Sequence, residues 1–217
     1  MTTMVNELTK CRLVDINCPI CRKKEKKMTK DDRRVRKTKL LLQESLAALF
    51  SQKGLQNITI RELTDYADVH RSTFYAHYDD IYALYRAIEN KVIIELSDLI
   101  IVNFTLDSKE YYEILLDYVD QNRQFCKMLF SEYAPASFLA RLTELFKEAC
   151  IKSWENFPGK TELSEELLYL VDYHVQGCFT MVRKWTSADF LFSKEKLVSM
   201  IATIDERIAK ILAKRLV

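Results

Sequence analysis

Three thiols near the N-terminus come closest to forming a metal site in this sequence. Cys11 lies upstream of the segment Cys18-Pro19-Ile20-Cys21, whose spacing resembles half of a zinc-binding array. A closed structural zinc site uses four ligands, and no fourth cysteine or histidine is near. We therefore expect no bound metal and no cofactor. Residues 1–31 are interpreted as a disordered arm or, if Met28 is the natural start, as a misassigned extension.

Histidine and glycine are too sparse for the common catalytic arrangements. The chain has three His and three Gly in 217 residues. No histidine pair forms a metal or nucleophile constellation with a nearby acid, and no phosphate-binding glycine loop is present. The sequence therefore predicts that the protein is not an enzyme.

Charge is unevenly distributed along the chain. Residues 1–91 carry 18 Lys/Arg and 12 Asp/Glu, a net charge of +6, whereas the remainder carries a net charge of −4. A basic N-terminal part suits a phosphate-backbone partner, although ordinary solvated charge gives the same pattern. Neither a secretory signal nor an apolar run of about 18 residues is found. We expect a cytoplasmic protein without a membrane span.

The scarcity of turn-forming residues predicts an all-α fold of about nine long elements. Only three Gly and three Pro are present, and helix-favouring residues dominate. The expected helices run over about 32–53, 59–67, 70–77, 79–101, 109–121, 122–131, 135–157, 164–185 and 193–216. We expect a three-helix head over residues 32–95 and a second helical domain over residues 96–217.

The signals around the second short helix predict a helix-turn-helix motif over about 59–78. Gly54 stands where a C′ glycine would end the first helix. Thr59 and Glu62 have the spacing of a capping box. A steep crossing of the two short helices needs a small residue, here Ala67, and a turn residue that tolerates a left-handed backbone, here Asp68.

The stretch from Leu42 to Leu84 resembles the DNA-binding domain of the TetR/AcrR family of transcription regulators. The resemblance is carried by the following residues: Leu49-Phe50, Gly54, Thr59-Ile60, Leu63, Ala67, Val69 and Thr73-Phe74-Tyr75-Ala76-His77-Tyr78. It implies a dimeric regulator that binds a double-stranded DNA operator. It also implies that residues 32–95 bind the DNA and that residues 96–217 supply the dimer interface and a possible effector site. The segments 122–145 and 174–185 resemble a C-terminal domain common among these regulators, and regulators associated with dihydroxyacetone kinase have similar features.

The resemblance also implies roles for individual residues. It assigns base contacts to His70, Arg71 and Ser72, with Arg71 as the main specificity residue. It assigns phosphate contacts to Thr38, Thr59, Thr73, Tyr75 and His77. Plainer interpretations stay open for three of these residues. Thr59 can serve only as a helix cap, Tyr75 can pack against the first helix, and Ser72 can be exposed without a partner.

The sequence departs from the family pattern at three places, and the third departure weakens the expected phosphate contact. The turn has Asp68 where glycine is usual, and the next helix starts with His70 where serine is usual. A lysine that commonly contacts phosphate is replaced by Ile81, directly after Asp79 and Asp80. The alternative function is therefore a helical co-regulator that acts through protein partners.

The last two predicted helices have wide apolar faces, which favour a four-helix bundle across a two-fold axis. Gly177 lies mid-helix, where a close helix crossing would justify it. The residues expected at the dimer interface are Val175, Gly177, Cys178, Phe179, Val182, Ile201, Ile204 and Ile208. Intramolecular core is the alternative for each of them.

Aromatic residues are frequent between the head and the last helical pair, and part of them could line a pocket for a small-molecule effector. Ordinary core packing is the alternative for each. The residues are Tyr111, Tyr112, Phe125, Phe130, Tyr133, Phe138, Phe146, Trp154, Tyr169 and Tyr173.

Overall fold

The computed structural model describes residues 30–103, 107–155 and 165–215, and the chain divides into two compact units, Met1–Leu40 and Leu41–Val217. The described part contains nine α-helices, one short 3-10 helix and no strand, which confirms the all-α prediction. The cysteines Cys11, Cys18 and Cys21 lie outside the described residues. So does most of the expected N-terminal arm.

Three helices make up the head expected from the sequence. They are α2 (Lys30–Phe50), α3 (Ile60–Tyr66) and α4 (Arg71–Tyr75), with the 3-10 helix η1 (Leu55–Asn57) between the first two. From Leu41 onward, α2 contributes Leu42 and Leu46 to the core, both fully buried. Leu63 of α3 and Phe74 of α4 are also fully buried, so each of the two short helices is anchored by its own large apolar side chain.

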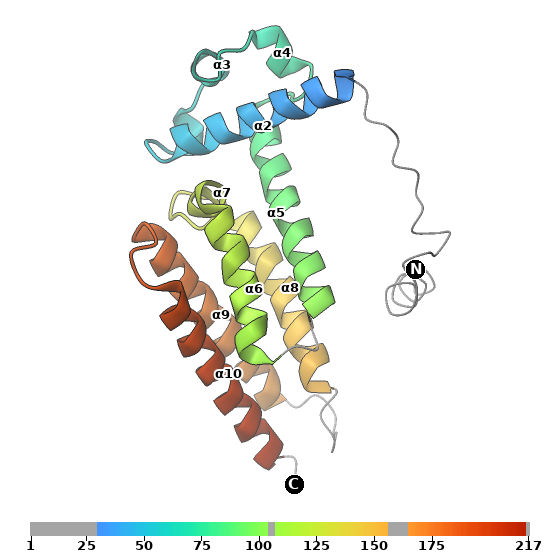
Figure 1. The fold of residues 1–217 in the computed structure, drawn as a ribbon, viewed down its shortest axis with the longest axis vertical. Helices are drawn as coiled ribbons and strands as arrows, with labels where there is room; N and C mark the ends of the chain where they lie inside the picture. The colour runs from blue at the N-terminus through green and yellow to red at the C-terminus, as the bar shows by residue number, and fades with distance from the viewer. Residues whose placement is uncertain (1–29, 104–106, 156–164, 216–217) are drawn as a thin grey trace, which may run out of the picture. The chain divides into compact units, whose positions relative to one another are not determined.

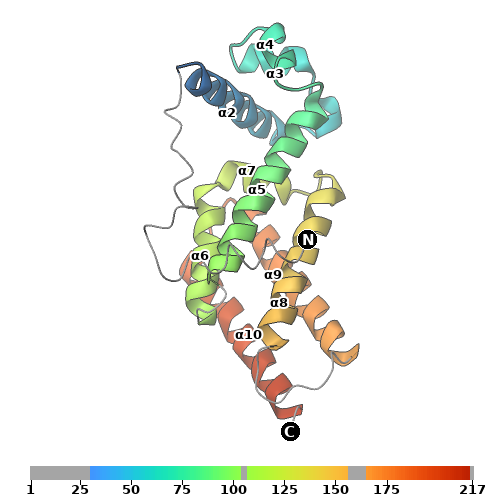
Figure 2. The same ribbon diagram turned by 90° about the vertical axis from the view of Figure 1, so that its right-hand side faces the viewer.

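Six helices follow the head. They are α5 (Ile81–Asn103), α6 (Ser108–Gln121), α7 (Arg123–Leu129), α8 (Ala136–Glu155), α9 (Glu165–Ser187) and α10 (Lys194–Arg215). Helix α5 leaves the head and lies beside α6 and α8 (Figures 1 and 2). Helix α10 packs against α6 and α9, and α9 packs against α8, so the body is a layered helical bundle.

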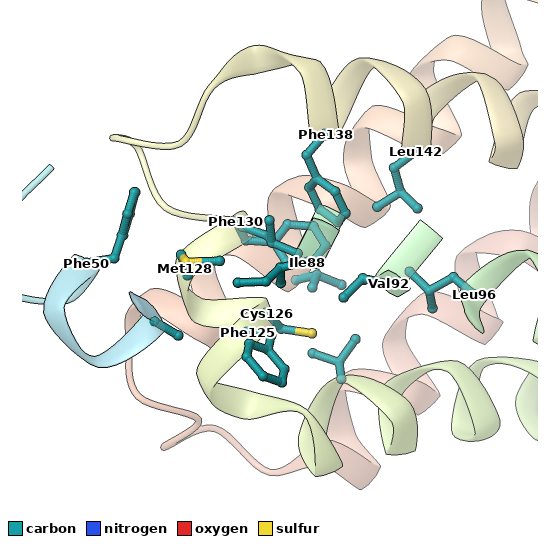
Figure 3. Packing of buried hydrophobic residues seen from close by; sticks show 14 of the residues in the cluster. Phe50, Ile88, Val92, Leu96, Phe125, Cys126, Met128, Phe130, Phe138 and Leu142 are labelled. Carbon is teal, nitrogen blue, oxygen red and sulfur yellow. The ribbon is translucent and has the colours of Figure 1, made fainter. Parts of the chain in front are cut away.

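Helix α7 fills the top of this bundle with apolar side chains. Figure 3 shows Cys126 of α7 and Phe130 at its C-cap in one cluster with Ile88 and Val92 of α5 and Phe138 of α8. The rings of Phe130 and Phe138 meet edge to face, with centroids 5.5 Å apart. An edge-to-face aromatic pair adds about 1 kcal/mol beyond its buried area. Helix α7 is therefore held by packing, although it is only seven residues long.

The capping residues act partly as expected. Thr59 accepts a hydrogen bond from the amide of Glu62 at 3.2 Å, so it is the N-cap of α3. The carboxylate of Glu62 does not complete the predicted capping box, because it pairs with Lys53 at 2.5 Å instead. Of the two aspartates before α5, Asp80 accepts a bond from the amide of Ala83 at 2.6 Å.

Gly54 is not the left-handed C′ residue that we expected. Its φ is −61°, and it stands at the N-terminus of η1, beyond the end of α2. A C′ glycine that ends a helix needs a positive φ. The 3-10 turn that follows Gly54 therefore replaces the simple helix stop that the sequence indicated.

Helix α5 crosses the domain boundary that we placed between residues 95 and 96. It runs without interruption from Ile81 to Asn103, so the head and the body share one continuous element. Within the described ranges, none of the helices combines the length and apolar character needed to span a bilayer.

Candidate nucleic-acid interface and ligand cavity

The turn between α3 and α4 fixes how α4 projects. Asp68 has a φ of 51°, the left-handed backbone predicted for this turn, and the amide of Val69 donates to the carbonyl of Thr64 at 3.0 Å. Ala67 is buried at the crossing, as its small size predicted. Phe74 anchors one side of α4 in the core, so the opposite side of this short helix faces outward.

The outward side of α4 carries most of the predicted base-contacting and phosphate-contacting residues. His70, Arg71 and Ser72 are exposed, and Tyr75 is 58% exposed. Thr73 and His77 are half-buried. Because Tyr75 follows Arg71 by four residues and Ser72 by three, these side chains share one face of the helix. The structure thus brings an arginine, a hydroxyl and a phenol onto a single accessible surface.

Aromatic contacts fasten the end of α4. The ring of Phe74 packs against those of Tyr75 and Tyr78, with centroids 5.6 and 5.9 Å away. Gln43 of α2 donates to the Tyr78 hydroxyl at 3.4 Å, and burial raises the pKa of that hydroxyl above its usual value. Tyr75 touches Phe74 with one edge while most of its surface stays accessible, so packing and external contact are compatible at this residue.

Two further predicted phosphate contacts lie outside α4. Thr59 is exposed at the N-cap of α3, where its oxygen accepts the capping bond. Its hydroxyl hydrogen is therefore still available as a donor. Thr38 is a half-buried residue of α2 and belongs to the Met1–Leu40 unit.

The charges beside this surface are of both signs. Asp79 and Asp80 are exposed directly after the motif, and Arg61 on α3 lies 3.7 Å from Asp65. Both partners of that pair are about three-quarters exposed, so it contributes little to stability. Arg61 is consequently able to leave Asp65 for another anion at small cost.

The residues expected at a dimer interface divide into two groups. Most of them face the interior of the subunit, where they pack within its own helical bundle: Val175, Phe179, Val182, Ile201 and Ile208. Cys178 is half-buried. Ile204 is 41% exposed and Gly177 is exposed. For the buried group, the structure follows the intramolecular alternative, because α6 and α8 cover the apolar faces of α9 and α10.

A different face of α9 and α10 is apolar and exposed. Tyr169 and Tyr173 are 70% and 72% exposed, and Gly177 continues the same line one turn further along α9. A Cβ atom added at Gly177 would meet nothing within 4 Å. Met200 and Ile204 form a similar pair on α10, 48% and 41% exposed. Within the described part of the subunit, no contact explains either the glycine or this exposed apolar surface.

A partly open cavity of about 140 Å³ lies in the body, among α5, α6, α8, α9 and α10. Its walls are mostly aliphatic and aromatic. Of the aromatic residues considered as pocket candidates from the sequence, four line it: Tyr111, Tyr112, Phe130 and Phe146. An apolar cavity of roughly 150 Å³ in another protein stays dry and binds benzene. The present cavity is thus large enough for a molecule of that size.

One side of the cavity is polar. The hydroxyl oxygen of Tyr112 lies 2.9 Å from Nε2 of His174, and Asp205 Oδ1 lies 3.2 Å from the same nitrogen. Ser108 donates to Asp205 Oδ2 at 2.6 Å. Burial lowers the pKa of His174 below its usual value, against the opposing effect of Asp205. Burial likewise raises the pKa of Tyr112. The imidazole and the phenol are therefore both uncharged at neutral pH.

Two thiols complete the polar side. Burial raises the pKa of Cys150 and of Cys178 to about 12. Since the thiolate is the reactive form, both sulfurs are weak nucleophiles at neutral pH. Among the described residues, no three metal-ligating side chains come together. This arrangement suits reversible, non-covalent binding.

Phe130 lines both this cavity and a second hollow. The second hollow has a volume of about 560 Å³ and is lined by Phe50 at the end of α2, by Tyr66 of α3 and by residues of α7. Nearby, Gln124 of α7 donates to the backbone carbonyl of Glu44 in α2 at 3.1 Å. The segment formed by α7 and Phe130 therefore contacts the cavity on one side and the head on the other.

Asp205 and Ser108 were not predicted as polar cavity residues. The signal for Asp205 was present, because an acid interrupts the apolar stripe formed by Ile201, Ile204 and Ile208 on α10. Ser108 gave no comparable signal, since a serine at the start of a helix is common without any ligand role.

Two family models match the chain. The model for bacterial regulatory proteins of the tetR family matches residues 44–88, which span the end of α2 through the first part of α5. The model for a transcriptional regulator C-terminal region matches residues 107–206. Between them they cover most of the head and of the body, including the α4 surface and most of the residues that line the cavity. No curated protein sequence matches the chain.

Solved structures with the same fold include the following three regulators. "Dihydroxyacetone kinase operon activator DhaS" is 20% identical with a TM-score of 0.57, covering 80% of this chain and 97% of that one. A TetR regulator from Streptococcus agalactiae 2603V is 21% identical with a TM-score of 0.58, covering 80% and 96%. NalD, the secondary repressor of the MexAB-OprM multidrug efflux pump in Pseudomonas aeruginosa, is 15% identical with a TM-score of 0.55, covering 81% and 96%.

Proposed function

Because the chain belongs to the TetR family of DNA-binding transcription regulators, we propose that it represses transcription as a homodimer and is released from its operator by a small-molecule effector. The observation that supports this proposal most is the division of α4 into two faces. Phe74 is fully buried while Arg71, Ser72 and Tyr75 are exposed. A helix held in this way presents base-reading and phosphate-binding groups to a major groove.

The exposed apolar residues on α9 and on α10 support the homodimer. Gly177 follows Tyr169 and Tyr173 along one face of α9, so a second copy of α9 could approach closely at the glycine while the tyrosines pack beside the crossing. Buried tyrosines are common anchors of protein interfaces. In this arrangement the interface of the homodimer uses Gly177 and Ile204 from the set predicted from the sequence, together with Tyr169, Tyr173 and Met200.

Sedimentation velocity tests the dimer separately from DNA binding. The wild-type protein is expected to sediment as a dimer at micromolar concentration. Tyr173→Glu places a charge on the proposed interface and is expected to give a monomer with unchanged helix content. Tyr133→Glu is the matched control, because Tyr133 is 73% exposed but lies between α7 and α8. A wild-type monomer, or equal effects of the two variants, would contradict the proposed interface.

Selection of binding sites from a random DNA pool tests the operator. A two-fold dimer presents two copies of α4, so the enriched site is expected to contain inverted half-sites about one helical turn apart. A reporter gene placed behind that site is expected to be expressed less when the protein is present. Increased expression would instead identify an activator, the role for which DhaS is named.

The second candidate function is a co-regulator that acts through protein partners. The specific observation in its favour is at the start of α5. The family pattern has a phosphate-binding lysine where this chain has the buried Ile81, and the two exposed residues directly before it, Asp79 and Asp80, are acidic. If selection enriches no sequence although the protein is folded and dimeric, the co-regulator function is the better account.

A further inference from the structure

The proposed effector site has a definite size, charge and polarity. From these properties we infer that the cavity binds a compact molecule of about one ring, which carries a hydrogen-bond donor and no negative charge. This inference rests on the proposed function only for the role of the ligand as an effector. Binding itself can be tested without DNA.

Size sets the first limit. The volume of about 140 Å³ matches the cavity size known to accept a single benzene ring. The rings of Tyr111 and Tyr112 stand edge to face with centroids 5.2 Å apart, and those of Phe146 and Phe179 do so at 5.4 Å. All four residues line the cavity. They offer ring faces and edges to a flat apolar guest.

Charge sets the second limit. Among the described residues that line the cavity, Asp205 is the acid, and neither lysine nor arginine is present. His174 adds no positive charge because burial keeps its imidazole neutral. An anionic guest would face the Asp205 carboxylate in an apolar cavity without a compensating cation, which is strongly unfavourable. A neutral or positively charged guest meets no such penalty.

Hydrogen bonding sets the third limit. A carboxylate offers about four acceptor positions. The contacts of Asp205 with Ser108 and His174 occupy two of them. The carboxylate is 21% exposed, and Asp205 lines the cavity, so it can accept a further bond from a guest hydroxyl or amine. An apolar guest with one donor at its edge would satisfy both the rings and this carboxylate.

Four probes of nearly equal size separate these limits. Benzyl alcohol has a neutral donor, benzylamine a positively charged donor, toluene no donor, and benzoate a negative charge. Each is titrated by calorimetry into the full-length protein without DNA. We expect benzyl alcohol and benzylamine to bind about tenfold more tightly than toluene, as for one added hydrogen bond to a charged group. Benzoate is expected to bind most weakly.

Three variants locate the site. Asp205→Asn keeps the shape and removes the charge, and it is expected to abolish the preference for benzylamine over benzoate. Ala149→Phe fills the cavity from α8 and is expected to remove binding of all probes. Asp98→Asn is the control, because Asp98 lies on α5 and does not line the cavity. Circular dichroism melts confirm that each variant is folded.

The outcomes separate the ligand class from the effector role. Tight benzoate binding, an unchanged ranking in Asp205→Asn, or no binding of any probe at millimolar concentration would overturn the ligand class. If the probes bind in the expected order but leave operator affinity unchanged, the ligand class stands and the effector role fails. If they bind and weaken operator affinity, both are supported.

Discussion

The hydroxyl oxygen of Tyr112 lies 2.9 Å from Nε2 of His174, although 62 positions separate the two residues in the chain. This contact joins α6 to α9 inside the body. It also places a histidine that is 3% exposed next to a cavity. A histidine in such a place makes the stability of the fold depend on pH in a predictable direction.

His174 is expected to destabilise the fold as the pH falls below about 6.5. Burial lowers its folded-state pKa, so the unfolded chain takes up a proton at a higher pH than the folded one does. Where the unfolded state binds more protons, the free energy of unfolding decreases as pH decreases. Melting temperatures measured from about pH 7.5 to 5.5 are expected to fall more in the wild type than in His174→Gln. His70→Gln, at an exposed histidine, serves as the control and should retain the wild-type slope.

Arg71 is expected to carry sequence preference. Arg71→Ala should cost about 1–3 kcal/mol on the selected operator and flatten the preference at one position in each half-site. Arg61→Ala removes an accessible arginine from α3 and should reduce affinity for all sequences alike. Tyr75→Phe should also weaken binding without changing preference. Titrations on matched and mismatched duplexes measure both effects, and an unchanged preference in Arg71→Ala would contradict the assignment.

Asp79 is expected to limit DNA affinity. It is exposed and follows the motif directly, so Asp79→Lys removes a repulsive charge and can add one phosphate contact. Each added contact should steepen the log–log salt dependence by roughly 0.9. Asp79→Asn should tighten binding less and leave that slope nearly unchanged. Binding isotherms at several salt concentrations check both variants, and equal behaviour of the two would exclude a phosphate contact at this position.

Asp68 is expected to tolerate glycine and asparagine but not valine. Its φ of 51° lies in the left-handed region, which costs a residue with a branched Cβ about 1–2 kcal/mol. Asp68→Gly and Asp68→Asn should therefore melt near the wild-type temperature, while Asp68→Val should melt lower. Since the turn sets the direction of α4, Asp68→Val should also lose operator affinity. Equal melting of the Asn and Val variants would show that the turn can relax.

Gly177→Ala is expected to stabilise the fold of the monomer and to weaken the association of two monomers into the dimer. A Cβ there meets nothing within 4 Å in the subunit, and alanine favours a helix interior over glycine by about 1 kcal/mol. In a dimer that crosses at Gly177, the same methyl group would separate the two helices. Sedimentation over a dilution series should show a larger dissociation constant. A tighter dimer would place the interface elsewhere.

Sequence periodicity located the helices well, but it did not predict which neighbouring elements cover their apolar faces. The nine expected helices all occur, with ends that shift by a few residues because caps such as Asp80 and turns such as η1 decide the last turn. The apolar stripes of α9 and α10 were identified correctly, but Val175 and Ile201 pack inside the subunit. A stripe shows which face is buried and not which neighbour buries it.

The α4 surface was predictable because its residues are consecutive in the chain. The cavity was not, because it combines Ser108, His174 and Asp205 from three helices. These three residues come together because α6, α9 and α10 pack against one another, and the spacing of residues within one segment of the sequence does not predict such packing. Glu62 is a local example of the same limit. The capping-box pattern predicted that its carboxylate bonds back to Thr59, but the carboxylate forms an ion pair with Lys53 instead.

Phe130 borders both the cavity and the hollow that reaches Phe50 and Tyr66, so a single ring is shared by two compartments. If a guest displaces this ring and thereby alters operator affinity by some factor, thermodynamic reciprocity requires operator DNA to alter guest affinity by the same factor. The affinity of the protein for the effector would then depend on whether the protein is bound to DNA. A subunit bound at an operator would respond only to effector concentrations higher than those that saturate the free protein.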